Sequence, residues 1–291
     1  MLLPIAGLGL VLGWSFLQTA LHTPASGKHV ATTRASAMET AAKPAVASKP
    51  MTEPKATPPA SAAAEKSATK HRHGDLVLIL DDVGFDHQPL ASAMAIDPNV
   101  NFAILPNSEN ARTVAETLHG RGFELLCHLP MEPIGYPRQQ PGANAILRSM
   151  SDEQIAETTR ANVSAIPNIR GVNNHMGSAA TSDRRVMTTV LGALPKGLYF
   201  IDSKTVGTSI AGEVAHEMDI RTASRNVFLD DVQSEPAVRH QIEQLAQAAS
   251  NRGVAVAIGH MYPVTMKVLG EEAPRLRAEG FRFIRASEAV R

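Results

Sequence analysis

The sequence predicts an α/β fold organised as a closed or nearly closed barrel of about seven or eight mostly parallel strands. One observation is the apolar run from Leu76 to Leu80, which ends abruptly at the adjacent carboxylates Asp81 and Asp82, as a strand buried on both faces does. The other is a repeated order along residues 75–291, in which a helical stretch ends at a glycine and an apolar run follows at once. Alternating helices and strands build a parallel sheet, and this many strands in one domain favour a barrel.

The glycines that separate helices from strands are predicted to be left-handed helix caps, because glycine adopts that conformation without a steric penalty. A basic residue precedes four of the five, which suits the negative end of a helix. The predicted caps are Gly122, Gly171, Gly197, Gly253 and Gly280. The helices predicted between the strands cover residues 108–119, 151–165, 182–194, 209–218 and 235–251, and the second begins with a capping box from Ser151 to Gln154.

Composition excludes some functions and leaves others open. Lys plus Arg and Asp plus Glu both number 28 in 291 residues, so no excess positive charge favours a nucleic-acid partner, and none is predicted. The single cysteine, Cys127, excludes an internal disulfide and a cysteine-rich zinc site. It does not decide the redox compartment.

The N-terminal quarter differs in composition from the rest of the chain. Residues 1–21 are almost wholly apolar and about long enough to cross a bilayer, which predicts a membrane anchor or an export signal. Residues 22–74 are rich in Ala, Pro, Thr and Lys and are predicted to be a disordered tether. Residues 75–291 form the predicted folded domain. A buried helix of that domain is the less favoured interpretation of residues 1–21, because the tether isolates them.

Acidic and imidazole side chains recur where the predicted strands end. The carboxyl ends of parallel barrel strands lie on one face, so these side chains are expected to converge on a single site. One such histidine alone would more often be structural, but three beside three acidic strand ends favour a shared site. The residues at the six strand ends are Asp81–Asp82, His128, His175, Asp202, Asp230–Asp231 and His260.

Two histidines and one aspartate can bind a divalent metal and leave positions open for water and substrate, and zinc is the expected ion. Such an ion favours hydrolysis of an amide or ester. The spare carboxylate of the tandem pair would then act as general base and a further histidine as general acid. Neither a G-x-S-x-G elbow nor a phosphate-binding G-x-x-x-x-G-K-[ST] loop occurs in the sequence.

Five short motifs together resemble the divergent polysaccharide deacetylases, distant relatives of the NodB-type carbohydrate esterases. They are I-L-D-D-V-G at 79–84, H-L-P-M-E at 128–132, N-N-H-M-G-S at 173–178, F-I-D-S at 200–203 and A-I-G-H at 257–260. The resemblance covers residues 75–291 and implies a distorted (β/α) barrel of the NodB/glycoside hydrolase-deacetylase type. It also implies metal-assisted removal of acetyl groups from a polysaccharide in the bacterial cell envelope. Peptidoglycan is the first candidate substrate, and the protein would be membrane-anchored or exported to the periplasm.

The resemblance assigns roles to residues at matching positions. Asp81 matches the general base, Asp82 and His128 match metal ligands, and His260 matches the catalytic acid. The position of the second ligand histidine of the parent motif, four residues after His128, holds a glutamate in this chain.

That glutamate is Glu132, and His175 is preferred to it as the third ligand. Asn173 and Asn174 stand where the parent family has an arginine-containing motif, and either contact substrate or cap a turn. Asp202 and Asp230 are expected to orient a neighbouring imidazole or cap a helix. Two other functions stay open: a non-catalytic barrel that binds glycan or a cell-wall partner, and a metal hydrolase of another amide or ester.

Overall fold

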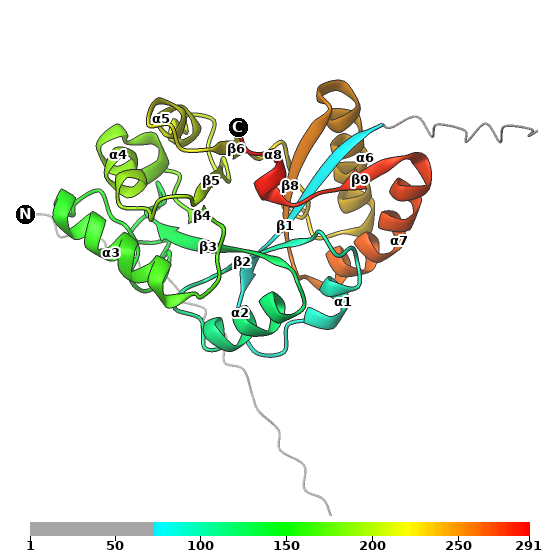
Figure 1. Cartoon of the computed structure of the whole chain (residues 1–291), viewed down its shortest axis with the longest axis horizontal. Helices are drawn as coiled ribbons and strands as arrows, with labels where there is room; N and C mark the ends of the chain where they lie inside the picture. Colours follow the sequence, from blue (N-terminus) through cyan, green and yellow to red (C-terminus); the bar gives the residue numbers. More distant parts are fainter. Residues whose placement is uncertain (1–72) are drawn as a thin grey trace, which may run out of the picture. The chain divides into compact units, whose positions relative to one another are not determined.

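The computed structural model describes residues 73–291, which form one curved parallel sheet with helices around its outer side (Figure 1). The predictions for residues 1–21 and for almost all of the tether lie outside the described residues. Within residues 73–291, no helix is long and apolar enough to span a bilayer. The strands are β1 Gly74–Val83, β2 Asn101–Ile104, β3 Glu124–Met131, β4 Gly171–Met176, β5 Tyr199–Asp202, β6 Thr222–Ser224, β7 Val227–Phe228, β8 Val254–His260 and β9 Phe281–Phe283.

The helices agree with the predicted alternation. They are α1 Leu90–Met94, α2 Ala111–Gly120, α3 Asp152–Ala165, α4 Arg184–Gly192, α5 Ala211–Glu217, α6 Glu235–Arg252, α7 Pro263–Glu279 and α8 Ala286–Ala289, with a 3₁₀ turn at Ala180–Ser182. The capping box at Ser151 is present, and Gly253 and Gly280 are left-handed caps as predicted. Gly171 is not a cap: it begins β4, and a Cβ there would come within 2.2 Å of the Tyr199 ring.

One short segment joins the two edges of the sheet. The strand order is β6-β5-β4-β3-β2-β1-β8-β7, with β9 also paired to β1, and every pairing is parallel. The edge strands β6 and β7 are separated in sequence only by Arg225 and Asn226. The chain therefore pairs first with β5 and then with β8 as it crosses the remaining gap. The predicted α/β barrel is confirmed, in a distorted form.

Successive side chains of β1 point alternately to the two sides of the sheet. Leu76, Leu78 and Leu80 belong to the large core under the outer helices, whereas Val77 and Ile79 belong to a smaller core inside the barrel. Asp81 continues the inward-facing series at the carboxyl end of the strand. At the opposite end, Ile284, Ala286 and Val290 pack into the interior core, so the C-terminal segment closes the amino end of the barrel. The carboxyl end is left for the site.

Candidate metal centre and active site

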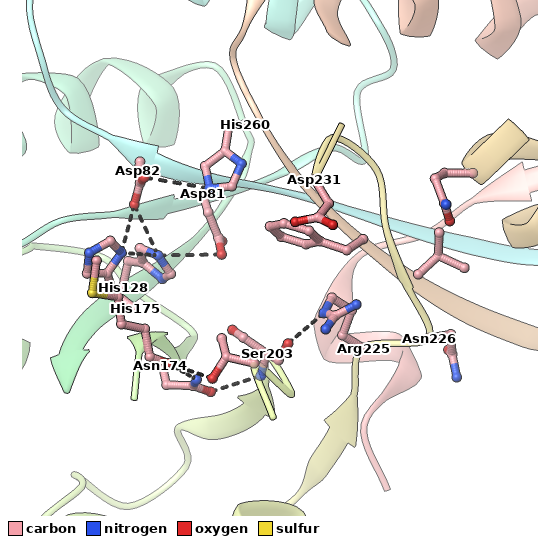
Figure 2. Close-up of a pocket in the computed structure, with 15 residues that line it drawn as sticks. Asp81, Asp82, His128, Asn174, His175, Ser203, Arg225, Asn226, Asp231 and His260 are labelled. Carbon is pink, nitrogen blue, oxygen red and sulfur yellow. Dashed lines mark hydrogen bonds and ion pairs between the residues drawn. The ribbon is translucent and has the colours of Figure 1, made fainter. Parts of the chain in front are cut away.

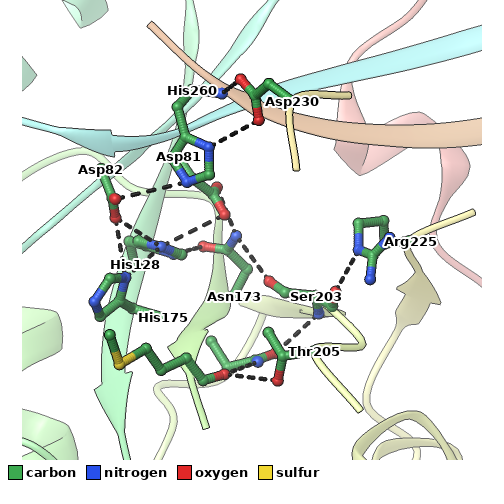
Figure 3. Close-up of polar contacts among 12 residues, drawn as sticks. Asp81, Asp82, His128, Asn173, His175, Ser203, Thr205, Arg225, Asp230 and His260 are labelled. Carbon is green, nitrogen blue, oxygen red and sulfur yellow. Dashed lines mark hydrogen bonds and ion pairs between the residues drawn. The ribbon is translucent and has the colours of Figure 1, made fainter. Parts of the chain in front are cut away.

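Strand register brings the predicted residues to one edge of the sheet. Asp81 of β1 lies opposite His260 of β8, and His128 of β3 lies opposite Asn173 of β4. His175, two residues further along β4, lies opposite Pro130. Figure 3 shows these side chains grouped at the carboxyl ends of the strands, with Asp82 beside them.

Three of them place one potential ligand atom each within a small triangle, which we call the donor triangle: Asp82, His128 and His175. The His128 Nε2 atom is 3.1 Å from His175 Nδ1 and 3.3 Å from Asp82 Oδ1, and the third side measures 2.9 Å. Ligand atoms about 2.0–2.1 Å from a tetrahedral zinc ion are separated by about 3.3 Å. The donor triangle thus has nearly the dimensions of one face of a zinc site.

Hydrogen bonding inside the donor triangle is incomplete. Within residues 73–291, Asp82 Oδ1 is one of two buried side-chain atoms that make no hydrogen bond, although His175 Nδ1 and His128 Nε2 both lie within ion-pair distance of it. Buried polar atoms of this kind are rare in proteins and call for an unseen partner such as an ion. Burial alone would raise the pKa of Asp82, but the imidazoles of His128 and His175 outweigh it and hold that pKa below its usual range. The residues present fit a divalent ion.

Asn173 fixes the tautomer of His128. Its amide nitrogen donates to Asp81 Oδ1 at 2.9 Å and to Ser203 Oγ at 3.2 Å, so its carbonyl oxygen faces His128 Nδ1, also at 2.9 Å. An oxygen acceptor there requires the proton of neutral His128 to be on Nδ1. The lone pair on Nε2 is then directed into the donor triangle, as metal ligation requires.

A loop immediately after β1 holds Asp82 in an uncommon conformation. Asp82 has a φ of +56° and Gly84 one of +122°. Gln88 stabilises this turn: its Oε1 accepts from the amides of Gly84 and Phe85 at 2.9 and 3.1 Å, and its Nε2 donates to the Asp82 carbonyl at 2.7 Å. Gln88 was not among the residues predicted from the sequence. An amide side chain shortly after the tandem acids was the available signal.

The two predicted proton carriers flank the donor triangle. Asp81 is buried, its Oδ2 lies 3.4 Å from His128 Nε2, and burial raises its pKa. His260 Nδ1 lies 3.0 Å from Asp230 Oδ1, while its Nε2 faces Asp82 Oδ2 at 3.6 Å. Burial would lower the pKa of His260, but the hydrogen bond to Asp230 and the nearby carboxylates raise it to about 9. Asp230 also accepts from the His260 amide and from Thr265.

The remaining predicted residues support loops. Asp202 accepts from the Lys204 amide and the Ser209 hydroxyl. Asn174 accepts from the Ser203 amide and also lines the cleft that opens beside the donor triangle. Both residues keep the chain after β4 and β5 in place.

Glu132 does not join the cluster. Its carboxylate accepts from the backbone and the side chain of Arg148, at 2.6 and 3.0 Å, and it is not among the residues that line the cleft. This placement supports the choice of His175 over Glu132 as third ligand.

The cleft of about 670 Å³ extends from the donor triangle toward the β6–β7 segment (Figure 2). Arg225 lies in this part of the cleft: its Nε and Nη2 atoms donate to the carbonyls of Ser203 and Lys204, both at 2.6 Å, and its guanidinium stacks 5.0 Å from the Phe228 ring centre. Arg225 was not predicted from the sequence, because β6 is too short to give an apolar run and Arg225 precedes the run that ends at Asp230 and Asp231. Asp231, which was predicted at a strand end, also lines this side of the cleft, together with Asn226 and Gln241.

The comparisons with known proteins agree with the geometry. The family model described as divergent polysaccharide deacetylase matches residues 78–290. The uncharacterized protein YibQ of Escherichia coli is 36% identical over 197 residues, which are 67% of this chain and 61% of YibQ. An uncharacterized protein of Haemophilus influenzae is 35% identical over 195 residues, covering 67% of this chain and 69% of that protein.

A solved structure shares the fold. The crystal structure of an uncharacterized protein from Agrobacterium tumefaciens C58 matches with a TM-score of 0.71 at 20% identity, over 80% of this chain and 92% of that one. The resemblance inferred from the five motifs is confirmed by the family match, which covers more than half of the sequence. The chain therefore belongs to the divergent polysaccharide deacetylase family.

Proposed function

We propose that this protein is a metal-dependent deacetylase of an N-acetylated polysaccharide of the cell envelope, with zinc as its ion. The observation that carries the proposal is the donor triangle in an open cleft, with Asp81 and His260 beside it on neighbouring strands. Ligands, a base and an acid around one cavity are the parts that amide hydrolysis requires.

Each residue has a separate task in this proposal. Asp82, His128 and His175 would hold the ion, which would supply a Lewis acid for the acetamide carbonyl and for water. Asp81 Oδ2 accepts a proton from the attacking water, and His260 Nε2 donates a proton to the departing amine nitrogen.

Two buried partners position these groups. Asn173 bridges Asp81 and His128, so the proposed base and a ligand share one rigid amide. Asp230 accepts from His260 Nδ1 and thereby keeps a proton on that nitrogen while Nε2 faces the cleft. Such partners typically change activity or metal affinity about 10- to 100-fold when removed.

The proposed location follows from the sequence. An apolar segment at residues 1–21 and a tether of small, polar residues would hold the barrel near a membrane surface, where envelope glycans are within reach. Peptidoglycan is accordingly the first polymer to test.

Acetate release tests the proposal directly. Full-length protein is incubated with N-acetylated chito-oligosaccharides and with peptidoglycan fragments, before and after removal of the ion with a chelator. We expect release that stops on chelation and returns when zinc is added. A wild-type protein that holds its ion and binds glycan but releases no acetate would reject catalysis and favour a non-catalytic glycan-binding barrel.

A further inference from the structure

Exposed basic side chains gather at the amino end of the barrel, at the other end from the cleft. Each of them precedes an element that begins at this end: Arg121 before β3, Arg170 before β4, Lys196 before β5, Arg221 before β6 and Arg285 before α8. Because parallel strands all begin at the same end of a barrel, these five residues lie on one face. We call them the basic band.

Hydrogen bonds connect neighbouring members of the basic band. Arg285 Nη2 donates at 2.9 Å to the carbonyl of the glycine that follows Arg121. Arg221 Nη2 donates at 3.3 Å to the carbonyl of the glycine that follows Lys196. The five side chains are therefore held as one surface by contacts between loops that are far apart in the sequence.

The middle of the basic band surrounds a hollow of about 340 Å³, which Arg170 and Arg285 both line. Burial raises the pKa of Tyr199 well above its usual range, and the charges of Arg170 and Arg221 oppose that shift, so both guanidinium groups lie near its hydroxyl. The Glu124 carboxylate in the lining is 6% exposed and already accepts three hydrogen bonds. The permanent exposed charges of the hollow are its two guanidinium groups.

The basic band is not neutralised within the domain. Arginines elsewhere form ion pairs with glutamates, as Arg184 and Arg239 do, but no member of the basic band pairs with a carboxylate of residues 73–291. The negative end of a helix accounts for Arg121, the C-cap of α2. It does not account for Arg170, which a turn separates from α3, or for Arg285, which stands at the positive end of α8.

Exposed acidic residues on this face are fewer than the basic ones. Asp219 lies in the turn between α5 and β6, and Glu288 accepts from the Arg285 amide at 3.1 Å. The five positive charges of the basic band therefore exceed the exposed negative charges beside them. Such a surface attracts an anionic partner.

The chain enters the domain at this same end. The His73 amide donates to the Gly280 carbonyl at 3.3 Å, its ring lies 5.5 Å from that of Phe281, and β1 begins at Gly74. The predicted tether would span about 40 Å on average, which keeps the basic band close to the membrane that residues 1–21 are predicted to enter. At such a high effective concentration, even a weak attraction to lipid is sufficient for docking.

We propose that the basic band docks the barrel on anionic lipid headgroups, with a headgroup phosphate in the hollow lined by Arg170 and Arg285. The barrel then stands with its amino end on the bilayer, and the donor triangle at the carboxyl end is directed away from the membrane. This inference goes beyond the proposed function: it involves neither the ion nor the deacetylation, and shares with it only the membrane location.

Protection of individual arginines from chemical modification tests the docking. Full-length protein is reconstituted into vesicles of phosphatidylcholine, with or without phosphatidylglycerol, and labelling by phenylglyoxal is followed by mass spectrometry. We expect phosphatidylglycerol to slow the labelling of Arg170 and Arg285 about 10-fold, and about 0.5 M salt to remove the difference. Arg160 of α3 is the internal control, since it is exposed and has no ion-pair partner among residues 73–291, and its labelling should not change.

A double variant separates docking by these side chains from general proximity to the membrane. Arg170→Gln/Arg285→Gln should lose the lipid-dependent protection of Arg221, whereas the matched control Arg160→Gln should keep it, and thermal unfolding checks that both variants are folded. Docking would be overturned if phosphatidylglycerol did not protect the basic band, or if the double variant kept the protection of Arg221. Equal protection by inorganic phosphate in phosphatidylcholine vesicles would assign the hollow to a free anion and would also overturn it.

Discussion

The two ends of the barrel contain buried polar clusters that share strand β3, and only one of them is internally satisfied. Glu124 and His128 are four residues apart on the inward face of β3. At the amino end, the Glu124 carboxylate accepts from the Tyr199 hydroxyl at 2.8 Å and from the amide and hydroxyl of Ser287. At the carboxyl end, His128 faces a carboxylate oxygen of Asp82 that has no hydrogen-bond partner.

What covers each end explains the difference. Residues near α8 close the amino end, where the Ala286 amide also donates to Asn101 Oδ1 at 2.9 Å. There, burial raises the pKa of Tyr199 well above its usual range and the adjacent Glu124 carboxylate raises it further, so the hydroxyl stays a donor. The carboxyl end opens into clefts instead. A satisfied network stabilises the fold, whereas converging lone pairs at an open end are suited to bind a cation.

The largest expected effect is on activity at the open end. Asp81→Asn keeps the shape of the side chain but cannot accept the proton from water, so the rate of acetate release should fall about 100- to 10,000-fold. Metal content and thermal stability should stay near those of the wild type, because Asp81 lies outside the donor triangle. Acetate release within threefold of the wild type would remove Asp81 from the role of base.

The next effect concerns orientation of the proposed acid. Asp230→Asn removes the carboxylate that raises the pKa of His260, so the rate should fall about 10- to 100-fold. His260 acts in its protonated form, and activity is therefore lost as pH rises through its pKa. Because the variant lowers that pKa, the alkaline limb of the pH–rate profile should move to lower pH. An unmoved limb would contradict this role for Asp230.

At the closed end we expect a loss of stability without a loss of chemistry. The Glu124 carboxylate accepts three hydrogen bonds, and Glu124→Gln replaces one of its acceptor oxygens with an NH₂ group that can only donate. The variant should therefore lower the free energy of unfolding by about 1–3 kcal/mol. Urea denaturation measures the change, and Asp81→Asn is its counterpart at the other end. If Glu124→Gln instead lost metal or activity at full stability, the division between the two ends would be wrong.

The smallest effect is expected from truncation. The two hydrophobic cores lie within residues 76–290, and β1 begins at Gly74. A chain that starts at His73 should therefore keep the thermal stability and the metal content of the full-length protein. Unfolding of the shortened chain would contradict the predicted domain boundary.

The sequence predicted those parts of the site that follow long buried strands. Leu76 to Leu80 and the run before His260 are apolar, so the acids and imidazoles at their ends stand out, and parallel register then brings them together. The resemblance to a known family supplied the roles of the residues, which their spacing alone could not.

Other features depend on tertiary contacts that no local pattern reports. Gly171 follows a basic residue, as the true cap Gly253 does, yet it is glycine because the Tyr199 ring occupies the space of a Cβ. Arg225 enters the cleft from a segment that changes pairing partner between β5 and β8, so no periodicity marks it. Phe85 and Gln88 lie in a loop whose left-handed turn becomes visible only in three dimensions.

The zinc content of purified protein tests the central claim, that the open end is a metal site and the closed end a structural network. Elemental analysis compares the wild type with His128→Ala and Glu124→Gln after dialysis against trace zinc. We expect about one ion per chain in the wild type and in Glu124→Gln, and none in His128→Ala. Full metal content in His128→Ala would contradict the account.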